Sequence, residues 1–216
     1  MKALIINYNR LTLPAALADW CAAHGLEPVF VDNASTYPPL MDYYHRCPYM
    51  VMHMNSNYGH KVPWLPEASV MHRLGINGSR YIVTDPDLDL TGVPADFLEI
   101  MNAGLDKYKG FDKCGLSLEI NDLPDNAEVQ AMAQNCEARY WTRPLDERYF
   151  AAPTDTTFAL YREGVNLYSH SAIRTNRPYT ARHVPWYYNG IESLPEDEQY
   201  YFKTAGKSCT ALMRLK

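Results

Sequence analysis

The chain has 216 residues, of which 47% are hydrophobic and 21% are charged. This composition is ordinary for a globular protein, so disorder over most of the chain is excluded. The 20 basic and 25 acidic residues give a formal net charge of −5, which argues against a broadly basic nucleic-acid-binding protein.

Cysteine usage and hydropathy point to a soluble protein of a reducing compartment. The five cysteines are scattered and form no C-x-x-C pair, so neither a disulfide framework nor a zinc site is predicted. The first apolar run, Ala3–Ile6, is too short for a signal peptide, and no run reaches the roughly 18 apolar residues of a membrane span. We expect a cytoplasmic protein without a transmembrane segment, either free or peripheral to a membrane.

The first half alternates strand-like and helix-like segments. In chain order we expect a strand over Ala3–Tyr8, a helix over Leu13–His24, a strand over Pro28–Asp32, a helix over Pro38–His45, a strand over Tyr49–Met54, a helix over Glu67–Leu74, a strand over Arg80–Thr84, a helix over Ala95–Leu105 and a strand over Lys113–Ile120. Such alternation is typical of parallel βαβ units. The predicted fold is therefore an α/β sandwich, with a mostly parallel mixed sheet flanked by helices.

The second half is less regular. Asp125–Arg139 has a helical pattern, while Glu147–Ala151 and Thr156–Tyr161 have strand patterns. From Ser169 onward the sequence is polar, aromatic and interrupted by prolines, which is typical of loops that order around a ligand. No boundary is sharp enough to divide the chain, so one domain over residues 1–216 is predicted.

Polar residues follow four of the predicted strands. They occupy Asn7–Arg10, Asp32–Thr36, Asn55–Gly59 and Asp85–Asp89. Ligands of open α/β sheets bind beyond the carboxyl ends of the strands. The four segments therefore predict a polar ligand held along one edge of the sheet.

The acidic segment Thr84–Asp89 (TDPDLD) is the sharpest motif. Neighbouring carboxylates repel one another unless a cation neutralises them, and Mg²⁺ or Mn²⁺ often binds one or two carboxylates together with substrate phosphates. The segment thus predicts a metal–diphosphate site, and the alternative is a loop that caps the next helix. A calcium-binding loop is rejected because Leu90 stands where such a loop needs glycine. Asp87–Thr91 also matches the D-x-D-x-T motif of aspartyl phosphatases, which stays as an alternative despite the preceding proline.

Four stretches, in order along the first half, resemble GT-A-fold, family-2-type nucleotide-sugar glycosyltransferases. Ile5–Arg10 (IINYNR) resembles their opening strand, and Val31–Thr36 (VDNAST) their second strand end, D-N-x-S-x-D. Asn55–Gly59 (NSNYG) is similar to their N-x-G segment, and Tyr81–Asp87 (YIVTDPD) to the strand and D-x-D motif that follow. The small one-domain glycosyltransferases of large algal viruses are a closer likeness. The resemblance implies a Rossmann-like GT-A fold with a nucleotide-binding half over about residues 1–110 and an acceptor and catalytic half over about 111–216.

The resemblance also implies a donor site. Mn²⁺ or Mg²⁺ would bind Asp87, with Asp85 at the ribose or at metal-bound water, and Asp89 would be a further ligand or a helix cap. The nucleotide base, ribose and phosphates would be contacted by Asn7, Tyr8, Asn9, Arg10, Asp32, Asn33 and Asn57. Lys61 either contacts a phosphate or is a solvated lysine. The chain departs from the family at Tyr37, where an acidic residue is usual, and it lacks the usual downstream E-D motif.

The catalytic base must therefore be argued from single carboxylates. Asp155, between a proline and a predicted strand, is our candidate for the general base, and Glu119 is its competitor. In the tail, His183 is a candidate metal ligand, and Arg177 or Arg182 is a candidate clamp for the diphosphate.

Together these residues predict a metal-dependent glycosyltransferase that uses a nucleotide-diphosphate sugar, UDP-linked by preference, and a glycan or other hydroxyl acceptor, with inversion of configuration. No nucleic-acid partner is expected, and the oligomeric state stays open. One alternative is a sugar nucleotidylyltransferase, although residues 1–20 lack the glycine-rich phosphate loop of that class. Another is a carbohydrate-binding relative that has lost catalysis.

Overall fold

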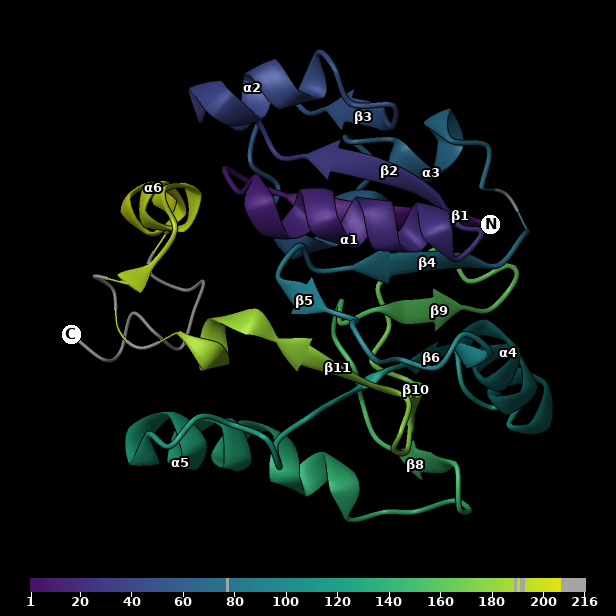
Figure 1. Ribbon diagram of the computed structural model, residues 1–216. Coiled ribbons are helices and arrows are strands. Elements are labelled where there is room, and N and C mark those ends of the chain that lie inside the picture. The colour runs from purple at the N-terminus through teal and green to yellow at the C-terminus, as the bar shows by residue number, and fades with distance from the viewer. Residues whose placement is uncertain (77, 189, 191–192, 207–216) are drawn as a thin grey trace.

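The computed structural model describes residues 1–76, 78–188, 190 and 193–206. An eight-stranded sheet crosses the molecule, and helices pack against both of its faces (Figure 1). In spatial order its strands are β3 (Met50–His53), β2 (Glu27–Asp32), β1 (Lys2–Asn7), β4 (Tyr81–Thr84), β9 (Ala159–Tyr161), β6 (Lys113–Gly115), β10 (Ala172–Thr175) and β8 (Tyr149–Ala151).

The sheet is mixed, and one strand of the second half lies inside it. Strand β9 runs antiparallel to both of its neighbours, β4 and β6, and the edge strand β8 runs antiparallel to β10. The other neighbours pair in parallel, so the carboxyl ends of β1 to β4 meet at one edge. Because β9 joins β4 to β6, the two halves of the chain share a single sheet.

Alternating apolar residues in the central strands supply a core on each face. Ala3 and Ile5 of β1 pack toward the layer of α1 (Thr12–Ala23), α2 (Pro38–Tyr44), α4 (Phe97–Lys107) and α5 (Ala127–Glu137). Leu4 and Ile6 pack toward the 3-10 helix η1 (Gly59–Trp64) and α3 (Val70–Arg73). A strand that is buried on both faces needs such a continuous apolar run.

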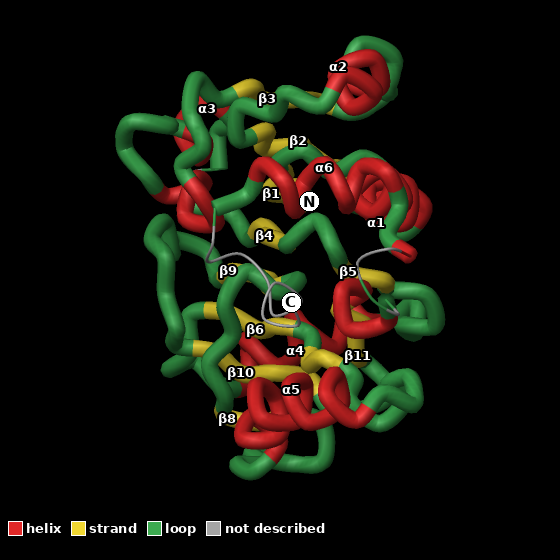
Figure 2. Tube along the Cα trace, turned by 90° about the vertical axis from the view of Figure 1, so that its left-hand side faces the viewer, coloured by secondary structure: helices red, strands yellow, loops and turns green. Residues whose placement is uncertain are grey.

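A second, three-stranded sheet joins β5 (Leu88–Asp89), β11 (Thr180–His183) and β7 (Ser117–Leu118). The 3-10 helices η2 (Ala138–Trp141) and η3 (Val184–Tyr187) follow α5 and β11. The last described element is α6 (Glu196–Thr204), which lies beside α1 near the end of β1 (Figure 2). Asp197 accepts hydrogen bonds from the backbone N–H groups of Leu11 and Thr12, so a carboxylate of α6 caps the start of α1.

The expected α/β architecture with a large mixed sheet is confirmed, and most elements of the first half fall within a few residues of their predicted bounds. Two expectations were wrong. The strand expected over Lys113–Ile120 is divided into β6 and β7, which belong to different sheets. The stretch after Ser169, where only loop character was expected for part of the chain and no strand or helix was predicted, contains β10, β11 and α6.

Two further properties concern cysteines and membrane spans. Cys21, Cys47, Cys114 and Cys136 carry free thiols, while Cys209 lies outside the described residues. Within the described ranges, no helix combines the length and the apolar character needed to cross a membrane.

Candidate functional site

A cleft of about 490 Å³ opens where the parallel strands end. Residues that follow β1, β2, β3 and β4 all reach it, and so do residues of the second half that are remote in sequence. Its polar lining includes Asn7, Tyr8, Arg10, Asn33, Asn57, His60, Asp85, Asp87, Asp155, Thr156, His183 and Tyr201. The four polar segments predicted to share one edge of the sheet are therefore brought together.

Asp87 lies at the buried side of this cleft and is only 5% exposed. Its Oδ2 accepts a hydrogen bond from Arg10 Nη1 at 2.7 Å and lies 3.4 Å from His183 Nε2. Burial favours the neutral form of the Asp87 carboxyl, but the Arg10 guanidinium and the neighbouring His183 hold its pKa well below the usual range. Asp87 is therefore a carboxylate already paired with an arginine.

The same corner gathers more acidic than basic side chains. Arg10 also forms an ion pair with Glu198 of α6, whose Oε1 lies 2.9 Å from Arg10 Nε. Burial and the charge of Asp87 raise the pKa of Asp85 to about 7. Burial likewise raises the pKa of Glu198 to about 7, against the attraction of Arg10. The carboxylates of Asp87 and Glu198 thus share the Arg10 guanidinium, and the nearby Asp85 adds a third acidic group that another positive charge would stabilise.

Unsatisfied polar atoms gather at this corner as well. Within the described part of the chain, no hydrogen bond reaches Asp87 Oδ1, His183 Nδ1 or Asn7 Oδ1, although all three atoms are buried. Buried polar atoms normally have partners, and exceptions often mark a place for a ligand or ion.

The carboxylate and imidazole groups of this corner fit a hard divalent cation if a substrate supplies further ligands. No three His, Cys, Asp or Glu side chains of the described residues are arranged to hold a metal by themselves. A cation such as Mg²⁺ needs only one or two carboxylates when phosphate oxygens complete its coordination. Asp85 and Asp87, with His183 beside them, supply that number.

Asp155 stands on another wall of the cleft, and its side chain is 56% exposed. The hydroxyl of Tyr168 donates a hydrogen bond to Asp155 Oδ1, and His60 Nε2 lies 3.8 Å from the same oxygen. From the interior, Lys113 Nζ donates to the Asp155 carbonyl at 2.6 Å. The carboxylate is therefore open to solvent, while its backbone is held by a buried lysine.

The Asp155 segment is tied directly to the acidic motif. The backbone N–H of Asp85 donates to the Thr156 carbonyl at 2.9 Å, and Thr156 Oγ1 donates to Asp85 Oδ1 at 2.5 Å. On its other side the segment packs on Gly115, where an added Cβ would lie 2.8 Å from Thr154 Cγ2. A close approach that only glycine permits thus helps to set the distance between Asp155 and β4.

Two of the predicted donor contacts organise the edge of the sheet rather than line the cleft. Asn9 has a φ of 54°, and its Oδ1 accepts hydrogen bonds from the backbone N–H groups of Thr36 and Tyr37. Asp32 is 1% exposed and accepts hydrogen bonds from the Ser35 backbone and the Tyr44 hydroxyl.

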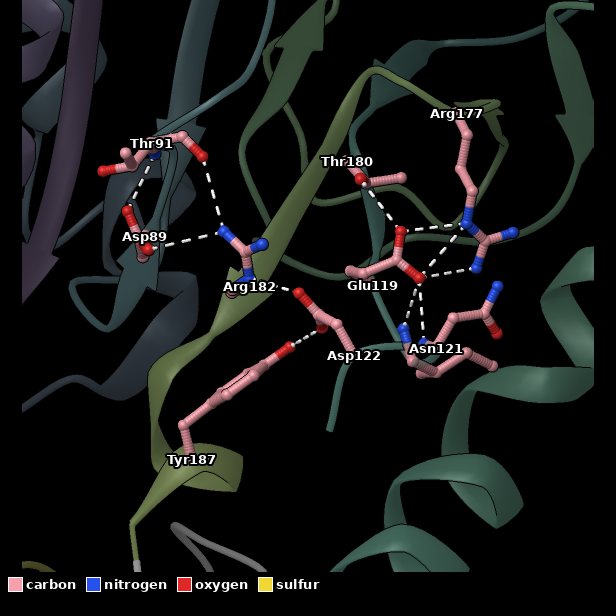
Figure 3. A network of polar contacts seen from close by, with 10 residues as sticks. Asp89, Thr91, Glu119, Asn121, Asp122, Arg177, Thr180, Arg182 and Tyr187 are labelled. Carbon is pink, nitrogen blue, oxygen red and sulfur yellow. Dashed lines mark hydrogen bonds and ion pairs between the residues drawn. The ribbon is translucent and has the colours of Figure 1, made fainter. Parts of the chain in front are cut away.

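Arg182 and Glu119 lie in polar networks outside the cleft lining (Figure 3). Arg182 Nε donates to Asp122 at 2.6 Å, and its Nη1 lies 3.9 Å from Asp89. The Glu119 carboxylate accepts hydrogen bonds from Arg177 Nε and Nη2, which fixes the candidate clamp and the candidate base to each other. Lys61, also outside the lining, is exposed with Nζ 4.6 Å from the centre of the Tyr168 ring.

Sequence reasoning missed Lys113, Tyr168, Glu198 and Tyr201. Lys113 reads as an ordinary strand residue, and Tyr168 falls in a loop without a motif. The acidic run Glu196–Glu198 offered a signal, because it opens a helical stretch within the aromatic tail, but nothing in the sequence placed it beside Arg10.

Comparisons of the sequence with known proteins identify no relative of this chain. No protein-family model matches the sequence, and no curated protein matches it.

Proposed function

We propose that this protein is a metal-dependent glycosyltransferase of the GT-A fold. It transfers a sugar from a nucleotide-diphosphate donor, UDP-linked by preference, to a hydroxyl group of a glycan or other acceptor, with inversion. One observation carries the proposal: the polar ends of β1 to β4, together with Asp155 and His183, converge on one cleft that is lined by both Asp85 and Asp87, and Asp87 Oδ1 has no hydrogen-bond partner among the described residues.

The donor half of the site follows from the parallel strands. Tyr8 and Asn33 line the part of the cleft at the ends of β1 and β2, where a base and ribose would lie. Asp85 and Asp87 would hold Mn²⁺ or Mg²⁺, with His183 beside them. The cation would neutralise the charge that develops on the departing diphosphate.

The transfer itself needs a proton acceptor, and Asp155 has the required exposure. In the proposed step a carboxylate oxygen of Asp155 takes the proton of the acceptor hydroxyl, while the hydroxyl oxygen of the acceptor attacks the anomeric carbon. The new carbon–oxygen bond forms while the bond to the diphosphate breaks, and the nucleoside diphosphate leaves with the electron pair. Attack opposite to the leaving group inverts the anomeric centre.

The proposal is tested by donor hydrolysis with Mn²⁺ and a panel of nucleotide sugars. We expect metal-dependent release of nucleoside diphosphate, and protection of the protein against heat by the matching donor. Asp87→Asn should reduce the release of nucleoside diphosphate on the order of 100-fold or more and abolish the protection against heat. Asp89→Asn is the matched control, because Asp89 belongs to the same segment but accepts its hydrogen bond from the Thr91 backbone outside the cleft.

The acceptor step has a separate test. Asp155→Asn should keep the affinity for donor and metal and lose transfer, and persistent transfer would remove Asp155 as the base. Formation of a nucleotide sugar from pyrophosphate chemistry would instead favour a sugar nucleotidylyltransferase. A protein inactive in both assays that still binds glycans would be a non-catalytic relative.

A further inference from the structure

Glu198 is a fully buried carboxylate that the proposed reaction does not use. Its side chain is 0% exposed, and it comes from α6, at the far end of the chain from the strands that build the cleft. Within the described residues, neither of its carboxylate oxygens has a hydrogen bond of good geometry, and its partner is the Arg10 guanidinium at 2.9 Å. Burying such a charge is costly unless it is paired, so this ion pair is essential to Glu198.

Arg10 is shared between the cleft and α6. Its Nη1 binds Asp87, its Nε faces Glu198, and its guanidinium carbon lies 3.8 Å from the centre of the Tyr201 ring. A second cation bound at Asp87 would be repelled by Arg10 across a short, poorly solvated distance. The arginine therefore needs another counter-ion whenever Asp87 serves a metal.

We propose that Glu198 is a positioning residue that holds Arg10 while Asp87 binds a divalent cation together with the donor diphosphate. The inference rests on the proposed function. When the cation is bound, Glu198 becomes the main counter-ion of the Arg10 guanidinium. Asp87 can then bind the cation without leaving Arg10 unpaired. Helix α6 thereby contributes to metal affinity although it offers no metal ligand.

Other contacts hold α6 in place independently of Glu198. Asp197 binds the backbone of Leu11 and Thr12, and Asn9 Nδ2 donates to Thr204 Oγ1 at 2.9 Å. A glutamine at position 198 preserves the shape of the side chain and removes only its charge. Glu198→Gln is therefore expected to fold with α6 docked.

The test is direct titration of the purified protein with Mn²⁺, alone and with UDP. Glu198→Gln should weaken Mn²⁺ binding by about tenfold, within the usual range of coupling between sites. Glu137→Gln is the matched control, because it neutralises another buried carboxylate that pairs with an arginine. Glu137 Oε2 lies 2.6 Å from Arg174 Nη1, and neither residue lines the cleft. The control variant should leave Mn²⁺ affinity within about twofold.

A double-mutant cycle separates this role from a general loss of negative charge. If Glu198 acts through Arg10, the Glu198→Gln effect should vanish in an Arg10→Met background, whereas a field effect would persist unchanged. Should Arg10→Met fail to fold, the comparison of Glu198→Gln with Glu137→Gln decides. Equal Mn²⁺ affinity in wild type and Glu198→Gln overturns this inference alone. Absence of Mn²⁺ binding in every variant, with or without UDP, overturns the metal-dependent function and this inference with it.

Discussion

Replacing Lys113 tests whether the cleft is held by a buried charge. Lys113 is 0% exposed, and burial lowers the pKa of its ammonium from 10.5 to about 8, although the charge of Asp155 opposes the shift. At about 1.4 kcal/mol for each pH unit, carrying this proton costs the folded state about 3 kcal/mol below pH 8. The unfolded chain binds more protons between pH 8 and 10.5, so this cost disappears as the pH rises through that window.

Lys113→Met removes the titrating group, and it also removes the hydrogen bonds to the Asp155 carbonyl and the Tyr161 hydroxyl. The free energy of unfolding of wild type, relative to the variant, should therefore rise by about 2 kcal/mol between about pH 7 and pH 9.5. Urea unfolding of both proteins across this range measures the difference, in which the titration of shared groups cancels. Lys109→Met, at an exposed lysine, is the control. A difference that does not change with pH would refute a charged, desolvated Lys113.

Three further predictions concern the scaffold of the site. Gly115→Ala should lower turnover more than donor affinity, because the new Cβ meets Thr154 and displaces the Asp155 segment. Steady-state kinetics measure both quantities. Gly110→Ala is the control, since an added Cβ there meets nothing within 4 Å. Asp197→Ala should lower the free energy of unfolding by about 1–2 kcal/mol in urea titrations, since two backbone donors at the start of α1 lose their acceptor. Asn9→Ala should cost about 2–4 kcal/mol by the same measurement, because it leaves two backbone donors unpaired and strains the left-handed φ.

The first half of the fold was predictable because its central strands, β1, β2 and β4, are buried on both faces. Runs such as Leu4–Ile6 and Val29–Val31 are short and apolar, as the buried strands of a parallel sheet are, and the polar residues that follow them lie at the edge where ligands of such sheets bind. Convergence of the acidic motif with Asn33 and Asn57 follows from parallel topology alone.

The second half was less predictable because its strands are very short. Strand β7 has two residues, and β6, β8 and β9 have three each, so none of them shows a period. The sequence of β11 likewise does not show which of its side chains face the cleft. His183 lies beside Asp87, so its neighbour Arg182 points the other way, toward Asp122. Only the register of β11 against β5 decides which of the two reaches the cleft. The contacts of Glu198 depend on the packing of a distant helix, which no local pattern records.

Strand β9 limits how this protein can be recombined with others. Since its backbone hydrogen bonds link β4 to β6, a chimera that exchanges everything after about residue 110 must recreate a seam between strands of two different origins. A mismatch there would expose the edge of β4 to pairing with other chains and favour aggregation. Hybrids of this protein are therefore better made by grafting single loops than by exchanging everything after about residue 110.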